Sequence, residues 1–230
     1  MPGRWTMSMA WMRMPGQTWA GAAASFLGMW TVMMVAMMLP ALAPMLWRYR
    51  QAVGGRGETR RGSLTVLVGV AYFFVWTVLG MAAFPLGVGL AQAEMQLPAL
   101  SRAVPIAVGA VVLAAGALQF TAWKTYHLAR CREPSACGRT LPEDAVAAWR
   151  HGLRLGLHCC YCCAGLTAIL LVIGIMDLRA MAGVTAAISV ERLAPAGRRV
   201  ERAVGIVVIG AGGFLIARAI GLPFTTSCAT

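Results

Sequence analysis

Charged residues are scarce in this sequence, and acidic ones are the scarcest. Only 12% of the 230 residues are charged, with 8 acidic against 20 basic ones, while 59% are apolar. A soluble domain carries charges on roughly a quarter of its residues, so a globular protein surrounded by water is excluded. The composition indicates that lipid is the natural solvent of this chain.

The sequence also lacks the motifs of several common enzyme classes. It has no Walker loop, no Gly-x-Ser-x-Gly elbow, no His-Glu-x-x-His helix and no dinucleotide-binding fingerprint. ATP hydrolysis, serine chemistry and hydride transfer therefore have no support, and we favour a role other than catalysis. The first residues lack the compact apolar run and cleavage site of a signal peptide, so we expect them to remain on the mature protein.

Long apolar stretches predict an all-α integral membrane protein, a polytopic bundle of six transmembrane helices. About 20 apolar residues suffice to cross the hydrocarbon core. One predicted span, 178–193, is short enough to lie at the interface instead, which would leave five. The others are 19–47, 64–90, 103–123, 152–175 and 200–220. They form one domain over residues 19–222, between an outer Met- and Trp-rich segment, 1–18, and an outer tail, 223–230.

Basic residues alternate between the predicted connections, and cytoplasmic loops are the ones that collect Lys and Arg. This pattern predicts a bacterial inner membrane protein with both termini outside the cytoplasm. It also excludes nucleic acid as a partner, because the charge is spread over three short loops that face the lipid bilayer. The residues are Arg48, Arg50, Arg56, Arg60 and Arg61 after the first span, Lys124, Arg130, Arg132, Arg139, Arg150 and Arg154 after the third, and Arg192, Arg198, Arg199 and Arg202 after the fifth.

The most distinctive motif is a run of thiols in the fourth predicted span. Residues 158–163 read His-Cys-Cys-Tyr-Cys-Cys, and helical spacing places several of these side chains on one face. Soft thiolates with an imidazole nearby suit Cu(I), zinc or a related soft metal. Close helix packing explains one or two such small residues but explains four badly. The predicted metal ligands here are His158, Cys159, Cys160, Cys162 and Cys163.

Cys131 and Cys137, with His127 nearby, lie in the connection before this span. On the predicted cytoplasmic side, a reducing environment disfavours structural disulfides. The two thiols are candidates for metal ligands or transient redox partners, although a Cys-x5-Cys spacing is not a standard zinc pattern. Cys228, in the outer tail, is assigned no role.

The first predicted span carries methionines at helical spacing, followed by Pro40 and Pro44, which we expect to kink the helix. Thioethers that face the bundle interior could pass a soft cation such as Cu(I). The outer segment adds further Met and Trp residues, as copper-capturing periplasmic proteins do. Methionine is also an ordinary core residue, so packing is the alternative. The candidate ligands are Met33, Met34, Met37 and Met38.

Three polar residues lie near the predicted membrane depth, where such residues are functional candidates. These are Gln119, Lys124 and Glu191. We expect Glu191 to form an ion pair, with Arg154 or Arg192 as its partner; the alternative is a carboxylate beside the thiols.

Four ordered motifs together resemble the bacterial predicted metal-binding integral membrane proteins, a family of unknown function. They are residues 29–40, residues 119–124 with Cys131 and Arg132, residues 156–163, and residues 176–192. The resemblance spans about residues 19–192 and implies metal binding. The family pattern in the fourth span is Cys-x-Gly-Cys-Cys-Trp, which Cys159, Cys162 and Cys163 match. Tyr161 and Ala164 depart from it, and Cys160 is an addition, so metal preference or packing could differ.

Three functions remain open from the sequence. The first is a membrane protein that binds a soft transition metal, copper before zinc, for transport or delivery, with a metallochaperone as partner. The second is a membrane oxidoreductase, or a subunit of one, whose cysteines hold a catalytic metal or cycle between dithiol and disulfide. The third is an accessory subunit of a larger membrane complex, which the Gly-rich stretch 205–213 favours.

Overall fold

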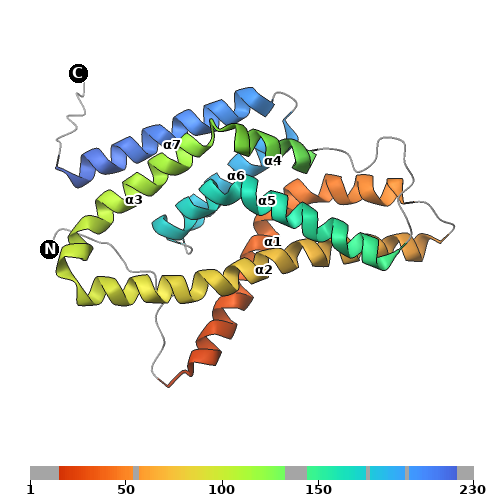
Figure 1. The fold of residues 1–230 in the computed structure, drawn as a ribbon, viewed down its shortest axis with the longest axis horizontal. Coiled ribbons are helices and arrows are strands. Elements are labelled where there is room, and N and C mark those ends of the chain that lie inside the picture. The colour runs from red at the N-terminus through yellow and green to blue at the C-terminus, as the bar shows by residue number, and fades with distance from the viewer. Residues whose placement is uncertain (1–15, 54–56, 133–143, 175–176, 195–196, 222–230) are drawn as a thin grey trace.

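The chain folds into helices that pack along and across one another (Figure 1). The computed structural model describes residues 16–53, 57–132, 144–174, 177–194 and 197–221. Within these ranges it has seven helices and no extended strand. They are α1 (Trp19–Ala52), α2 (Glu58–Gln96), α3 (Pro98–Leu118), α4 (Ala122–Arg132), α5 (Ala145–Ile173), α6 (Leu178–Leu193) and α7 (Gly197–Ala219).

Helix α1 starts at a polar cap and bends along its length. The Thr18 hydroxyl accepts a hydrogen bond from the Gly21 N–H at 3.1 Å, which satisfies one of the free donors at the helix start. Pro40 and Pro44 lie inside the helix and remove two backbone donors. Figure 1 shows α1 changing direction between its two ends, as the expected kink requires.

Helix α5 lies directly against α2 because two glycines leave room for the backbone. A side chain at Gly152 would meet the Val68 carbonyl oxygen and would lie 2.7 Å from the Ala71 Cβ. One turn later, a side chain at Gly156 would lie 3.0 Å from the Tyr72 carbonyl oxygen. Glycines four residues apart form one small-residue face, the arrangement that lets membrane helices approach closely.

Helices α3 and α7 form a second close pair, also through glycine. A side chain at Gly116 would lie 3.0 Å from the Ile209 backbone nitrogen, and one at Gly212 would lie 2.8 Å from that of Leu113. Part of the Gly-rich stretch 205–213 thus packs against α3 of the same chain. Gly210 and Gly213, by contrast, have nothing within 4 Å of an added Cβ.

The third predicted span is broken. Helices α3 and α4 meet at an angle of 68° across residues 119–121. There the backbone makes short-range turns, with the Phe120 N–H bonded to the Ala117 carbonyl and the Thr121 N–H to that of Leu118. The Thr121 hydroxyl then accepts from the Lys124 N–H at 3.4 Å, which caps α4. The span predicted over 103–123 is therefore helical to Leu118 and continues only after a bend.

Four helices of the described chain are long and apolar enough to span a membrane, and the bent pair α3–α4 makes up to five. The four are in α1, α2, α5 and α7. Helix α6 has the predicted bounds, but its 16 residues reach only about 24 Å, short of the roughly 30 Å of hydrocarbon. The six-span count is not confirmed, and the alternative of five equals the upper end of this range.

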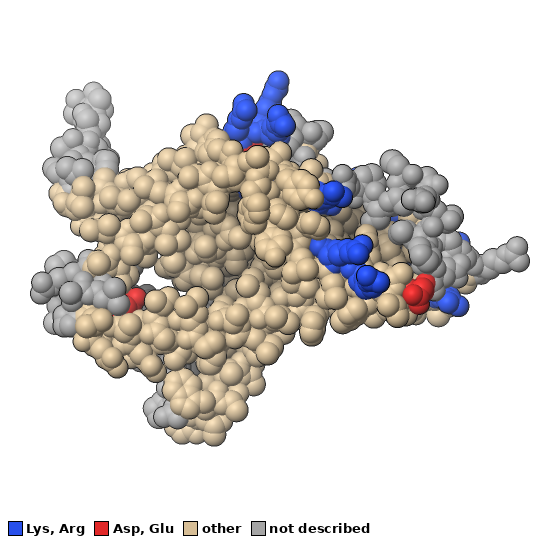
Figure 2. Space-filling model, viewed as in Figure 1, with Lys and Arg blue, Asp and Glu red and all other residues tan. Residues whose placement is uncertain are grey.

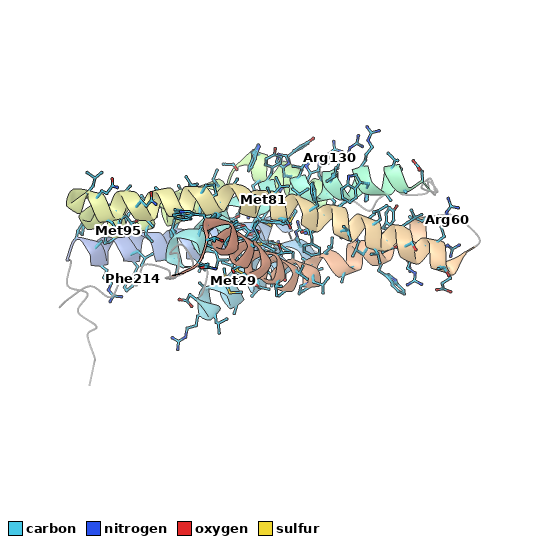
Figure 3. The ribbon with its side chains drawn as sticks, turned by 90° about the horizontal axis from the view of Figure 1, so that it is seen from below. Met29, Arg60, Met81, Met95, Arg130 and Phe214 are labelled. Atoms are coloured by element: carbon cyan, nitrogen blue, oxygen red, sulfur yellow. The ribbon has the colours of Figure 1, made fainter. Side chains whose placement is uncertain are left out.

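Polar and apolar side chains occupy different parts of the molecule. Figure 2 shows basic residues over the end of α4, the start of α7 and part of α5, whereas the later halves of α2 and α7 are almost free of charge. In Figure 3, Arg60 and Arg130 lie in one half, and Met95 and Phe214 in the other. Helix α2 also exposes an apolar row at i,i+4 spacing: Val66, Val70, Phe74 and Val78. An apolar surface of this extent is typical of contact with lipid or a partner.

Candidate metal centre

Three thiols converge on the buried face of α5. The helix starts at Asp144, whose carboxylate accepts from the Val146 and Ala147 N–H groups. Within it, the sulfurs of Cys159, Cys162 and Cys163 all lie within 4.8 Å of one another. The Cys162 and Cys163 sulfurs are 3.6 Å apart, and those of Cys159 and Cys163 are 4.0 Å apart. Sulfurs that share one ion at about 2.3 Å are separated by about 4 Å, so this spacing fits a thiolate site.

A fourth thiol approaches from α4. The Cys131 sulfur lies 3.8 Å from that of Cys162, and both are almost fully buried. The bend between α3 and α4 makes this contact possible, because it turns α4 toward α5. The structure thus adds Cys131 to the group, while Cys137 lies outside the described residues.

An arginine reaches the same sulfurs from α6. The Arg192 Nη2 lies 3.5 Å from the Cys131 sulfur and 3.7 Å from the Cys162 sulfur. The Nε and Nη1 of this buried guanidinium have no hydrogen-bond partner among the described residues. A buried cation is costly unless negative charge lies close by. The arrangement therefore suits thiolates better than neutral thiols.

Tyr72 of α2 also contacts the thiol group. Its hydroxyl donates to the Cys159 sulfur at 2.8 Å, and both groups are fully buried. Such a hydrogen bond favours the charged form of the sulfur. The glycine contacts of α5 with α2 set this distance, because they fix the separation of the two helices.

A buried ion pair connects α4 and α6 beside the thiols. The Lys124 ammonium donates to both carboxylate oxygens of Glu191, at 2.9 and 2.8 Å. The expected ion pair of Glu191 is confirmed, but its partner is Lys124 instead of Arg154 or Arg192. Gln119 is also buried, and its Oε1 has no partner among the described residues.

His158 does not turn into the thiol group. Its Nδ1 lies 2.9 Å from the Nδ1 of His127, which belongs to α4. Rings of Trp123, Tyr126 and Tyr161 lie 4.8 to 5.2 Å from the His127 ring. His151, two turns earlier on α5, stacks on Tyr49 of α1 at 5.2 Å. The structure therefore separates an imidazole pair from the sulfurs.

The four candidate methionines of α1 are buried in the same core as the thiols. Met33, Met34, Met37 and Met38 are at most 6% exposed and belong to one cluster with Cys131 and the three close cysteines of α5. Shared burial is what core packing also produces, so their role as ligands stays a prediction. The methionines of the outer segment, 1–18, all precede residue 16 and lie outside the described residues.

A cavity of about 160 Å³ lies beside Cys131 and Arg192. Its lining includes Pro44 and Arg48 of α1, Cys131 of α4, and Arg192 and Leu193 of α6. Arg48 and Leu193 are exposed, whereas Cys131 is buried. The cavity therefore lies between the exposed Arg48 and Leu193 and the buried residue Cys131.

The sequence named all four of these sulfurs as candidates, Cys131 with a transient redox role as the alternative, but it did not indicate their surroundings. Cys160 is half-buried and lies outside the close group, so the structure does not bring together all the predicted ligands. Tyr72 had no signal in the sequence. The contact of α4 with α5 did have a signal in the sequence, because His127 and Cys131 are four residues apart, as are His158 and Cys162.

Comparison with known proteins identifies the family. A model of the PpoB2 family, described as a copper chaperone, matches residues 27–215. No curated protein and no solved structure matches the chain. The matched segment contains every sulfur of the close group and the α1 methionines. The expected membership of a bacterial metal-binding family is confirmed in part, because the matching family is related to copper. Because the match covers most of its length, the chain belongs to the PpoB2 family of copper chaperones.

Proposed function

We propose that this protein is an integral membrane copper chaperone that holds Cu(I) at Cys159, Cys162 and Cys163 and passes it to an acceptor through Cys131. The main observation that supports this proposal is the group of three buried thiols within 4.8 Å of one another. Soft thiolates select Cu(I) or zinc, and the family description favours copper.

The groups around the thiols supply a positive charge and a hydrogen-bond donor, which a negatively charged copper–thiolate complex requires. Three thiolates and one Cu(I) carry a net charge of about −2, and this charge needs compensation in a buried site. Arg192 supplies one positive charge at hydrogen-bond distance from Cys162, one of the three sulfurs, and from the neighbouring Cys131. The Tyr72 hydroxyl adds a donor to a third sulfur.

A route for the ion can be assembled from the sulfur residues. The α1 methionines share the core with the thiols and would form the path from the outer side of the bacterial inner membrane. An acceptor, a metallochaperone or another soft-ligand carrier, would take the ion at the cavity beside Cys131, from the cytoplasmic side. Bilayer lipid would cover the exposed apolar face of α2. Transport along this route, in either direction, is part of the proposal.

A transfer experiment tests chaperone function. Protein purified in detergent is loaded with one equivalent of Cu(I), mixed with excess chromophoric Cu(I) chelator under argon, and its free thiols are counted before and after. A chaperone releases the copper with every thiol recovered, because no electron leaves the sulfurs. The same count is expected when a quinone is added as electron acceptor; loss of two thiols with reduction of one quinone would contradict the proposal and support a dithiol oxidoreductase.

A further inference from the structure

The α4–α5 contact carries two matched pairs of soft or borderline ligands, one helical turn apart. On α4 they are His127 and Cys131, and on α5 they are His158 and Cys162, each four residues apart. The imidazole nitrogens are 2.9 Å apart in one pair, and the sulfurs are 3.8 Å apart in the other. Residues at i and i+4 are neighbours on a helix, so the two pairs form consecutive rungs.

The two rungs differ in access. Both histidines are half-buried, while Cys131 and Cys162 are almost fully buried. Trp123 and Tyr161, which flank the imidazoles, are each nearly half exposed. An ion that reached the thiols along this contact would therefore meet the imidazoles first.

We propose that His127 and His158 form a second Cu(I) site, which exchanges the ion with the thiol group through Cys131 and Cys162. This inference rests on the proposed function. Imidazole nitrogen is a good ligand for copper, and two metal–nitrogen bonds of about 2.0 Å span roughly 2.9 to 4 Å as the angle at the metal opens from about 90° to 180°. The observed separation lies at the narrow end, so the rings move apart slightly when the ion enters.

The proton balance of the imidazole step is simple. In the ion-free pair, the Nδ1–H of one ring donates to the Nδ1 of the other, and the tautomers decide which ring is the donor. When both Nδ1 atoms bind Cu(I), the donor ring keeps its proton by carrying it on Nε2. The ion stays Cu(I) in both sites, so no electron moves. Passage to the thiols releases one proton for each sulfur that binds as thiolate.

The test uses a variant in which all seven cysteines are serine, so that only nitrogen and thioether ligands remain. Cu(I) binding is measured by equilibrium dialysis and the ligands by X-ray absorption. We expect about one equivalent of copper with nitrogen ligands, which disappears when His127→Ala and His158→Ala are added. His151→Ala in the same background is the matched control, because the third histidine stacks on Tyr49 away from this contact, and it should leave the copper bound. Copper content unaffected by the double substitution, or no copper at all, would overturn the second site.

A second measurement keeps the thiols and so does not depend on folding of the serine variant. His127→Ala with His158→Ala in the native chain should slow copper uptake from a chelated donor at least tenfold, while one equivalent remains bound by sulfur. An unchanged uptake rate would overturn the exchange. Failure of the proposed function looks different, because the native protein would then hold no copper on sulfur.

Discussion

At the scale of single residues, the notable feature of the thiol group is the arginine beside it. A buried cluster of neutral cysteines would need no cation, since thiols behave as small apolar groups. Arg192 nevertheless places Nη2 against Cys131 and Cys162, while its other nitrogens find no partner in the described part of the chain. Its charge is best explained as compensation for thiolates that hold copper.

Replacement of this arginine should weaken copper binding. Hydrogen bonds to charged groups contribute about 1.5 to 3 kcal/mol, so Arg192→Leu should raise the Kd for Cu(I) at least about tenfold. Competition with a chromophoric chelator at fixed pH measures this change. Arg154→Leu is the control, because Arg154 is exposed on α5 and should leave the Kd unchanged. Equal affinities of the two variants would show that Arg192 does not compensate the site.

At the scale of the helices, the close approach of α5 to α2 positions the thiols. Gly152→Ala would drive a methyl group into the Val68 carbonyl and the Ala71 side chain. Overpacking of this kind costs typically about 1 to 3 kcal/mol, so the thermal midpoint in detergent should fall. Gly89→Ala on α2, where nothing lies within 4 Å, should leave the midpoint unchanged or raise it. A midpoint that falls no further for Gly152→Ala than for Gly89→Ala would contradict the close packing.

The buried ion pair between α4 and α6 should show strong coupling. Glu191→Gln leaves the Lys124 ammonium buried without its carboxylate, which costs about 3 to 5 kcal/mol of unfolding free energy. The double variant Lys124→Met with Glu191→Leu should recover much of that loss, because it buries no charge. Denaturant unfolding of both variants in detergent measures the difference. A double variant less stable than the single one would show that the pair does not act as a unit.

The sequence predicted the helices well, because apolar runs of about 20 residues reveal their own positions. It did not predict the break at 119–121, because Phe120, Ala122 and Trp123 continue the apolar run through the turn. The partners of α4 depend on that turn. The matched spacing of His127 and Cys131 with that of His158 and Cys162 is a signal of the α4–α5 contact, but without the turn it does not place the two helices together. The approach of Lys124 to Glu191 had no signal in the spacing.

At the scale of the whole molecule, the basic residues and the short α6 lead to different topologies. The charge pattern predicts six crossings with both termini outside, whereas a non-spanning α6 would place the termini on opposite sides. We expect alkaline phosphatase fused after residue 230 to be active, since the arginines of early α7 lie on the cytoplasmic side in this prediction. An inactive fusion, with an active cytoplasmic reporter at the same position, would show five crossings.

The most direct test of the central claim is the copper content of the gently purified protein and of a variant with Cys159→Ser, Cys162→Ser and Cys163→Ser. Cys160→Ser is the matched control, because this neighbouring thiol lies outside the close group. We predict about one equivalent of copper in the native protein and in Cys160→Ser, and loss of this sulfur-bound copper, seen by X-ray absorption, in the triple variant. The same sulfur-bound copper in all three proteins, or none in the native protein after reconstitution, would contradict a thiolate copper site on α5.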